Sequence, residues 1–352
     1  MEVHLDLLRQ LVQTPSFSRE EGATAMLLFD FLSARGWLPQ RHLHNIWVAS
    51  PHNRAGQPTL LLNSHHDTVK PVSGWQRDPF GASLEGTHLY GLGSNDAGAS
   101  LVGLLAAFEH LAQAPQPYNL IWAGTAEEEI SGANGIASLL PLLPPIDLAI
   151  VGEPTQMQLA IAEKGLMVLD CYAHGQAGHA ARQEGVNAIY KALPDIQWFA
   201  NYRFEQVSPV LGEVRMTVSQ VQAGTQHNVV PDRCHWVVDV RTTECYSNEA
   251  LLAEIKAQVS CEVVPRSLRL QSSGIALTHP VVQRGLALGK TTYGSPTLSD
   301  QALMPFPSLK IGIGDSARSH TADEYIVLSE LESGIADYIA LLDQLVFPPH
   351  IL

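Results

Sequence analysis

The chain has 352 residues, a hydrophobic content of 45% and a formal net charge of −14 at pH 7. These values are typical of a globular protein with one large domain or two domains of ordinary size. The negative charge argues against a nucleic-acid partner, because phosphate binding needs a basic face. No apolar run reaches the length of a membrane span, so we expect no membrane partner.

The N-terminus and the cysteines predict the compartment. The first residues, MEVHLDLLRQLVQ, form an acidic amphipathic segment rather than a basic and then apolar signal peptide. The four cysteines show no CxxC pairing, and free thiols are typical of a reducing compartment. We therefore expect a cytoplasmic protein whose metal site, if it has one, uses no sulfur ligand.

The first part of the chain alternates helical and strand-like patterns. Helices are expected at 3–13 and 22–35, with Gly36 as the C-cap of the second. Near-continuous apolar runs between helices then predict a mostly parallel sheet covered on both faces. The expected strands lie around 45–49 and in TLLLNSHHD, NLIWAGT and DLAIVGEPT, and the expected helices in AGASLVGLLAAFEHLAQ and in a segment ending near Leu143.

The pattern changes after about residue 164. The order strand, helix, strand, strand, helix, strand predicts a βαββαβ ferredoxin-like unit over 165–271, whose first helix is interrupted at Pro194. The first domain resumes at 272–352 with a helix in HPVVQRGLALGKTTY and a final helix in LSELESGIADYIALLDQLV. We therefore expect a discontinuous domain, 1–164 with 272–352, and one inserted domain.

Side chains that bind metals follow several of the apolar runs, where the ends of buried strands are expected. Any one of them has an ordinary alternative: Asp96 could cap the next helix, and the acidic run 127–129 could be a solvated loop. Together, two histidines and several carboxylates at strand ends predict a centre for two zinc ions, with one carboxylate left to act as a base. The candidates are His65, Asp67, Asp96, Glu128, Glu129, Glu153 and His320.

In their order and surroundings, the segments SHHD, SNDAG, AEEE, GEPT and SARSH resemble the co-catalytic zinc metallopeptidase family. That family includes acetylornithine deacetylase, succinyl-diaminopimelate desuccinylase, carboxypeptidase G and aminoacylase. The resemblance covers essentially the whole chain. It implies an α/β catalytic domain with a mostly parallel sheet flanked by helices, and an inserted lid that serves dimerisation.

The resemblance also implies a set of metal ligands. His65 and Glu153 would hold one zinc ion, Glu129 and His320 the other, and Asp96 would bridge the two. Cobalt or manganese can substitute for zinc in such sites. The family often has a cis peptide after the bridging aspartate, which here predicts a cis bond between Asp96 and Ala97.

Two more residues beside the ligands are interpreted through the same resemblance. Asp67 would hydrogen-bond and orient the ligand His65. Glu128 would be the general base that takes a proton from water and delivers it to the leaving nitrogen. The register within the three consecutive glutamates rests on the family pattern, so Glu127 stays an alternative base. His66 is expected to point away from the centre, because side chains alternate along a strand.

The inserted domain is expected to supply the rest of the site. His179 in GHAAR resembles a family histidine that reaches the partner subunit's site and stabilises the oxyanion, which implies a homodimer through the lid. Asn228 in HNVVPD and Arg241 in DVRTT match positions that hold polar groups of the substrate. An arginine suits a carboxylate because its planar fork binds both oxygens.

These assignments predict a hydrolase that removes an N-acyl group from an amino acid, with a small-molecule substrate. The motifs IVGEPT and GHAAR favour N2-acetylornithine or an acetylcitrulline-type substrate of arginine biosynthesis. The alternative is a succinyl-diaminopimelate desuccinylase of lysine biosynthesis. A different class, a metal-dependent binding protein without catalysis on the same fold, would be expected to have lost the base or a ligand, and none is missing.

Overall fold

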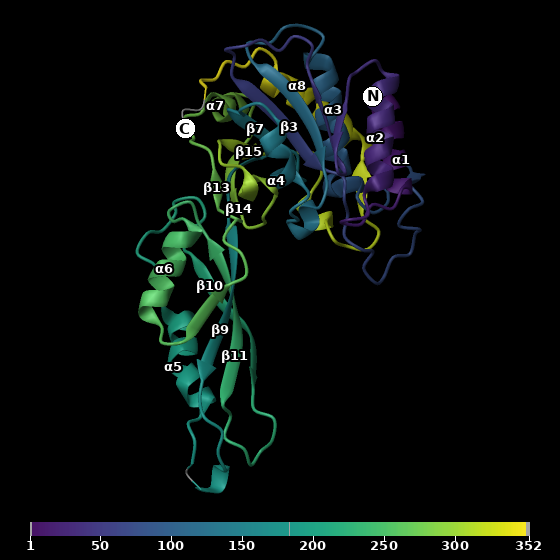
Figure 1. Cartoon of the computed structure of the whole chain (residues 1–352). Helices are drawn as coiled ribbons and strands as arrows, with labels where there is room; N and C mark the ends of the chain where they lie inside the picture. The colour runs from purple at the N-terminus through teal and green to yellow at the C-terminus, as the bar shows by residue number, and fades with distance from the viewer. Residues whose placement is uncertain (1, 183, 350–352) are drawn as a thin grey trace. The chain divides into compact units, whose positions relative to one another are not determined.

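The computed structural model describes residues 2–182 and 184–349. The chain divides into two compact units (Figure 1). Unit 1 comprises Met1–Ile161, Gly274–Tyr293 and Ser299–Leu352, and unit 2 comprises Ala162–Ser273 with Gly294–Leu298. No helix in the described part of the chain is both long and apolar enough to cross a membrane.

Unit 1 is built on a central sheet whose strand order begins β1-β2-β6-β3-β7-β15-β8. The neighbours β6, β3, β7 and β15 run parallel to one another, while β2 is antiparallel to β6. Every residue of β3 and β7 is buried, as expected for strands covered on both faces. The strands are β1 (Gln40–His42), β2 (Asn45–Ala49), β3 (Thr59–His65), β6 (Asn119–Thr125), β7 (Leu148–Val151), β8 (Leu159–Glu163), β13 (Ser273–Gly274), β14 (Thr292–Ser295) and β15 (Ser308–Lys310).

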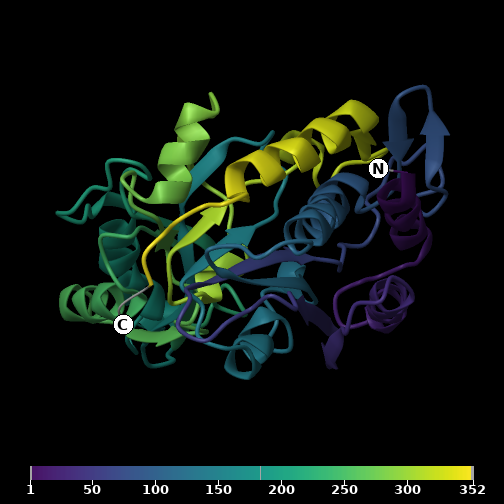
Figure 2. The same ribbon diagram turned by 90° about the horizontal axis from the view of Figure 1, so that it is seen from above.

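Helices cover both faces of this sheet. Helices α3 and α8 lie side by side on one face (Figure 2). On the other face, Ile136 and Leu139 of α4 pack against Leu61 and Ile121 of the sheet. The helices of unit 1 are α1 (Glu2–Gln13), α2 (Gly22–Ala34), α3 (Ala99–Leu111), α4 (Ile136–Leu139), α7 (Pro280–Ala287) and α8 (Leu328–Leu342).

Short elements connect these layers. A small antiparallel sheet has the order β16-β5-β4. Its strands are β4 (Ser83–Glu85), β5 (His88–Tyr90) and β16 (Tyr325–Val327). The short helical segments of unit 1 are η1 (Ser94–Gly98), η2 (Glu128–Ile130), η3 (Leu140–Leu142), η5 (Asp300–Leu303) and η6 (Ser316–Arg318).

Unit 2 is an antiparallel sheet of order β10-β11-β9-β12 with helices on one face. Strand β9 alternates buried and partly exposed residues, so its buried face carries the core of the unit. Trp236 and Cys171 of the sheet pack with Phe199 of α5 and Ile255 of α6. The elements are β9 (Gly165–His174), η4 (Ala180–Arg182), α5 (Ala188–Asn201), β10 (Arg215–Ala223), β11 (Arg233–Thr242), α6 (Asn248–Gln258) and β12 (Glu262–Pro265).

This arrangement confirms the expected α/β fold class, with a mostly parallel sheet between helices. Two local predictions were wrong. The helix expected to end near Leu143 is only the short α4 followed by η3, because Pro141 lacks the N–H that a longer helix would need. Helix α5 runs through Pro194 without interruption, since Ala192 and Phe199 on either side are buried in the core of unit 2.

Candidate metal centre

Parallel strands bring the candidate ligands to one edge of the sheet in unit 1. Strand β3 ends at His65, and its neighbours β6 and β7 end shortly before Glu128 and Glu153. The carboxyl ends of such strands form the usual ligand-binding edge of an open α/β sheet. Asp96 reaches the same edge from η1, and His320 from the loop after η6. The structure therefore gathers residues that lie far apart in the sequence.

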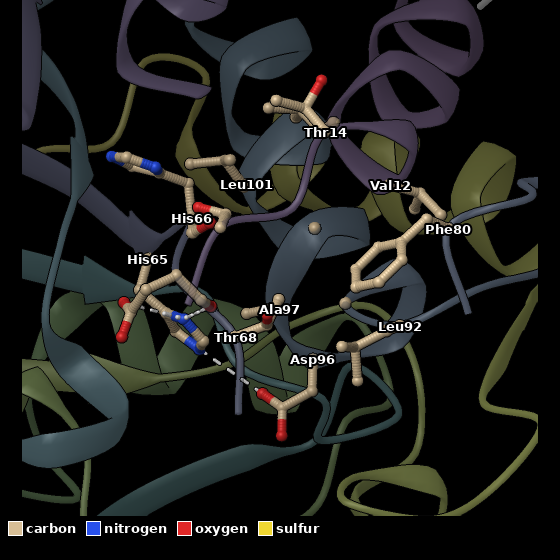
Figure 3. A pocket seen from close by; sticks show the side chains of 15 residues that line it. Val12, Thr14, His65, His66, Thr68, Phe80, Leu92, Asp96, Ala97 and Leu101 are labelled. Carbon is tan, nitrogen blue, oxygen red and sulfur yellow. Dashed lines mark hydrogen bonds and ion pairs between the residues drawn. The ribbon is translucent and has the colours of Figure 1, made fainter. Parts of the chain in front are cut away.

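His65 is the most buried of the five predicted metal ligands, with 1% of its side chain exposed. Its Nε2 atom lies 3.4 Å from Asp96 Oδ1, 3.7 Å from Glu153 Oε1 and 3.8 Å from Glu128 Oε2. Figure 3 shows the imidazole directed at Asp96. Three carboxylates thus surround one imidazole nitrogen at distances at which a cation could be shared.

Asp96 faces two groups of ligands at once. Its Oδ1 atom points to His65, while its Oδ2 atom lies 3.6 Å from His320 Nε2. The same Nε2 atom is 3.0 Å from Glu129 Oε2. The peptide bond between Asp96 and Ala97 is cis, which confirms that prediction. A carboxylate that offers one oxygen to each side is placed as a bridge between two positions.

Several of these atoms are buried without a hydrogen-bond partner. Within the described residues, His65 Nε2, Glu129 Oε1 and Glu153 Oε1 make no hydrogen bond. Buried polar atoms are normally satisfied, so such a concentration needs an explanation. Sets of residues that could each hold one ion are His65, Asp96 and Glu129, and His65, Glu128 and Glu153. Imidazole and carboxylate donors fit divalent metals such as zinc.

The electrostatic potential inside the cluster favours the binding of a proton or another cation. Burial and the charges of Glu153, Asp300 and Glu129 raise the pKa of Glu128 well above its usual range. Burial and Asp96 raise the pKa of Glu153 to about 8. The hydrogen bond with Glu129 raises the pKa of His320 to about 9. Crowded carboxylates that raise one another's pKa are typical of sites that bind cations.

Asp67 lies behind His65 and holds the acidic loop in place. The backbone carbonyl of Asp67 is 2.9 Å from His65 Nδ1, and its carboxylate is 3.5 Å from the same nitrogen. That carboxylate also accepts hydrogen bonds from the backbone N–H groups of Glu128 and Glu129, at 3.0 and 3.3 Å. Ser18 donates a further bond at 2.7 Å. One side chain therefore connects the ligand on β3 to the loop after β6.

Two neighbours of the candidates point elsewhere. Glu127 has a left-handed backbone, and its carboxylate accepts bonds from the backbone N–H and the side-chain amide of Asn134. His66 contacts Thr24 Oγ1 and the carbonyl of His44, each at 2.9 Å. Figure 3 shows its ring turned away from Asp96. The structure thus takes Glu127 and His66 out of the cluster.

Two buried carboxylates that the sequence did not identify as site residues support the centre. Asp300 Oδ2 accepts bonds from Asn63 Nδ2 and Thr125 Oγ1, both at 2.8 Å, near the ends of β3 and β6. Glu324 Oε1 accepts the backbone N–H groups of Asn95 and Asp96. Glu324 follows the candidate His320 by four residues, whereas Asp300 in TLSDQ is, from the sequence alone, as readily structural as functional.

The remaining predicted residues lie in unit 2. Ala180 N–H donates to the carbonyl of Asn228 at 3.1 Å, and His179 pairs with Val229 in an isolated bridge, so His179 and Asn228 belong to adjoining loops. Both residues are exposed. The guanidinium of Arg241, near the end of β11, binds Asp239 at 2.8 and 3.2 Å. These three residues belong to unit 2, whereas the cluster is formed by residues of unit 1.

The cluster of imidazoles and unsatisfied carboxylates has the donor set of a divalent-metal centre, and comparisons with known proteins identify the class of protein as a metal-dependent hydrolase. Residues 61–344 match the model of a protein family that is described as peptidase family M20/M25/M40. Because this match covers most of the chain, the protein belongs to that family, whose members hydrolyse amide bonds.

Curated relatives and solved structures resemble the chain over its whole length. A succinyl-diaminopimelate desuccinylase of Halorhodospira halophila is 27% identical, covering 99% of this chain and 100% of the relative. One of Delftia acidovorans is 26% identical, covering 93% and 94%. The aminopeptidase PepT of Bacillus cereus has a TM-score of 0.79 at 19% identity, covering 97% and 98%. The YXEP protein of Bacillus subtilis, described as a dinuclear metal binding peptidase, has a TM-score of 0.72 at 17% identity, covering 97% of each chain.

Proposed function

We propose that this protein hydrolyses the amide bond of N-succinyl amino acids, with two divalent metal ions, zinc foremost, in the centre of unit 1. The observation that carries the proposal is the cluster of two histidines and four carboxylates at the carboxyl ends of β3, β6 and β7. The curated relatives named succinyl-diaminopimelate desuccinylase favour a succinyl substrate over the acetylornithine or acetylcitrulline that the sequence motifs suggested.

The proposed ligands are the ones that the family resemblance assigns. His65 and Glu153 would hold one ion, His320 and Glu129 the other, and Asp96 would serve both with its two oxygens. When bound, the two ions supply Lewis-acid polarisation of the amide carbonyl and lower the pKa of water. Asp67 keeps His65 and the loop of Glu129 oriented through its contacts with both.

Glu128 is the proposed general base. Its carboxylate lies 3.8 Å from His65 Nε2 within the cluster, and burial raises its pKa well above the usual range. A carboxylate with a raised pKa accepts a proton from water more readily, and then delivers it to the departing amide nitrogen. Glu127 cannot take this role in the observed conformation, because Asn134 binds both of its oxygens.

A basic pocket in unit 2 supports a substrate with an extra carboxylate. The pocket has a volume of about 490 Å³ and includes Lys164, Arg215 and Arg241 in its wall. Arg215 stands directly opposite Arg241 in the pairing of β10 with β11. Like charges in this position repel each other, so the arrangement favours a bound anion. Burial and the charges of the two arginines lower the pKa of Lys164. Lys164 is therefore also repelled by the positive charges in the wall of this pocket.

A panel that varies the acyl group and the amino acid independently tests the substrate. Succinyl-diaminopimelate, succinylornithine, acetylornithine, acetylcitrulline and a dipeptide would be compared with metal-loaded protein. For one amino acid, we expect the succinyl form to exceed the acetyl form in kcat/KM by about 10- to 100-fold, the effect of one charged hydrogen bond. Equal rates would overturn the succinyl assignment. Bound metal with no hydrolysis across the panel would overturn the enzymatic one.

A substitution in the basic pocket refines that test. Arg215→Gln should lower the succinyl preference, while Arg233→Gln serves as the matched control. Arg233 is exposed at the start of β11, where its guanidinium lies over the ring of Tyr172 and outside the pocket wall. An equal change in both variants would show that the pocket does not hold the succinyl carboxylate.

We also propose a homodimer through unit 2. Strand β10 is an edge of its sheet, and none of the described residues pairs with its outer side. Exposed apolar side chains lie nearby on α5 and β10, including Tyr190, Leu193 and Val221. An open edge beside exposed apolar groups favours pairing with a second chain. In such a dimer, the exposed His179 would act in the partner's site.

Subunit mixing tests this trans role. A His179→Ala chain and a Glu128→Gln chain are each expected to form inactive homodimers. Mixed dimers should regain activity in one site, in which the intact Glu128 of the first chain meets the intact His179 of the second. If mixing restores nothing while sedimentation shows that mixed dimers form, His179 does not act across the interface. A fully active monomer would contradict the dimer itself.

A further inference from the structure

Glu324 has a buried carboxylate that binds the backbone on which a metal ligand sits. Its residue is 2% exposed, and its Oε1 atom accepts both the N–H of Asn95 and the N–H of Asp96, each at 2.9 Å. Its own carbonyl accepts the N–H of Gly91 at 2.9 Å. A charged acceptor shared by two consecutive N–H groups fixes the position of that peptide segment.

The loop that ends at Glu324 is bonded to the same segment at its other end. Asn95 Oδ1 accepts the N–H of Asp315 at 2.9 Å, and Asn95 Nδ2 donates to the carbonyl of Asp315 at 3.0 Å. Asn95 Nδ2 also lies 3.4 Å from Ser319 Oγ. The loop 315–324 is therefore held at its beginning by the side chain of Asn95 and at its end by the carboxylate of Glu324.

His320 lies between these two anchors and has little packing of its own. Its side chain is 52% exposed, and its backbone has φ of 57°, a left-handed conformation that is uncommon outside glycine. Its side chain forms ion pairs with the cluster carboxylates Glu129 and Asp96. Its position relative to Asp96 therefore depends on how the loop is attached.

We propose that Glu324 is a positioning residue that presets the spacing between Asp96 and His320. It thereby sets the affinity of the metal position that these two residues and Glu129 share. The inference rests on the metal centre of the proposed function, but it concerns metal binding alone and does not depend on which amide is cleaved. Hydrogen-bonded residues behind metal ligands commonly change metal affinity by about 10- to 100-fold.

The chemistry of the contact indicates which variants to compare. Both N–H groups bind the same oxygen, so Glu324→Gln keeps an acceptor in that place, whereas Glu324→Ala removes it. Asn95→Ala releases the other end of the loop and serves as a second disrupting variant if Glu324→Ala does not fold. Glu332→Gln and Glu332→Ala, at an exposed position of α8, are the matched controls for loss of charge and of the side chain.

The experiment measures metal affinity in the full-length protein without substrate. Metal-free protein is titrated with Zn²⁺ by calorimetry and with Co²⁺ by visible absorption, which resolve a tighter and a weaker ion. Glu324→Ala and Asn95→Ala are expected to weaken one of the two ions by about 10- to 100-fold, Glu324→Gln by less than about tenfold, and the Glu332 variants not at all. Equal weakening of both ions, or none, would overturn the proposal.

A double-mutant cycle distinguishes positioning from general stabilisation. On a His320→Ala background the ligand that Glu324 positions is gone, so Glu324→Ala should add little further loss of affinity. Fully additive losses would mean that Glu324 acts independently of His320, which contradicts the proposal. If the affinities behave as expected but no N-acyl amino acid is hydrolysed, the proposed function fails and the role of Glu324 stands.

Discussion

Unit 1 buries carboxylates in two contrasting ways. Glu109, on α3, is 7% exposed and is surrounded by donors. It accepts bonds from Arg35 Nε and Nη2 at 2.6 and 2.9 Å and from Trp37 Nε1 at 2.9 Å, and His4 Nε2 is 2.8 Å away. At the metal centre, by contrast, Glu153 and Glu129 each keep an oxygen that no described residue binds.

The pKa values of Glu109 and Glu153 move in opposite directions for this reason. Burial alone would raise the pKa of Glu109, but the bonds from His4 and Arg35 lower it to about 2. Burial raises the pKa of Glu153 to about 8, with the charge of Asp96 adding to the effect. Burial is common to both, but at Glu109 the bonds from His4 and from the cationic Arg35 outweigh it. Neutral donors do not have this effect, because Glu324 accepts two backbone N–H groups and its pKa is still raised to about 8. A buried carboxylate without a cationic partner is therefore the kind that favours a bound cation.

The largest expected effect is a loss of catalytic rate at the metal centre without a loss of stability. Glu128→Gln should lower kcat by about 10²- to 10⁴-fold, because it removes the proton acceptor while keeping the size of the side chain. Loss of one negative charge from a crowded cluster should leave the stability of the metal-free protein unchanged or raise it. Steady-state kinetics and denaturant unfolding of the same preparation give the two values.

The control for that variant is its neighbour in the same acidic run. Glu127→Gln changes the same charge on a side chain that Asn134 holds away from the cluster. It should therefore keep far more activity than Glu128→Gln. Retained activity in Glu128→Gln together with a large loss in Glu127→Gln would reverse the assignment of the base and contradict the observed placement.

The second effect concerns the donor-rich carboxylate. Since the pKa of Glu109 falls from its ordinary value of 4.5 to about 2 in the folded protein, its charge stabilises the fold by roughly 3 kcal/mol. That contribution is present above pH 4.5 and is lost as the pH falls toward 2. Glu109→Gln should lower the free energy of unfolding by a similar amount at pH 7, with no change in metal affinity.

Unfolding curves across pH check this prediction. The difference between wild type and Glu109→Gln should shrink as the pH drops through the window between 4.5 and about 2, since both chains are then neutral at this position. Glu332→Gln, an exposed change of the same charge, should stay within about 0.5 kcal/mol of wild type. A difference that does not vary with pH would mean that shape, not charge, makes position 109 important.

The third prediction tests whether a bound metal ion pairs with the carboxylates of the centre that lack protein donors. Adding Zn²⁺ at about 100 times its Kd should stabilise the folded chain by about 3 kcal/mol, and a chelator should reverse the gain. Thermal unfolding at several metal concentrations measures the shift. The stabilisation by Zn²⁺ should persist in Glu109→Gln and should be smaller in His65→Ala. Equal increments in both variants would place the bound ion elsewhere.

The positions of several cluster residues were accessible from the sequence. The apolar runs before His65, Glu128 and Glu153 predict parallel strands, and parallel strands present their carboxyl ends at one edge. The βαββαβ order of unit 2 is similarly visible from periodicity. Residue type and position at strand ends were therefore enough to nominate His65, Glu128 and Glu153, whereas Asp96 and His320 reach the cluster from η1 and from the loop after η6.

The hydrogen-bond partners were not accessible, because they depend on tertiary contacts. Glu324 binds the backbone of Asn95 from 229 positions away, and a glutamate in ADEYI carries no mark of that role. Glu127 and Glu128 are chemically identical, and only the left-handed backbone at Glu127 and its bonds to Asn134 separate them. The continuous helix through Pro194 likewise depends on packing that local propensity does not describe.

The smallest expected effect comes from a donor-rich carboxylate near the surface, Asp170 of unit 2. Arg266 binds it through two nitrogens at 2.7 and 3.0 Å, and His235 Nε2 lies 2.8 Å away, so its partners resemble those of Glu109. The pKa of Asp170 falls to about 2, chiefly through the bonds from Arg266. However, the side chain of Arg266 is 54% exposed, and water screens the pair.

Asp170→Asn should therefore cost no more than about 1 kcal/mol in the free energy of unfolding, against roughly 3 kcal/mol for Glu109→Gln. Denaturant unfolding at low and high salt checks both values, since salt should reduce the effect at Asp170 and leave that at Glu109. A large, salt-independent loss at Asp170 would show that the number of donors alone sets the stabilisation. A small, salt-sensitive loss of stability would show that a carboxylate needs burial as well as donors to stabilise the fold strongly.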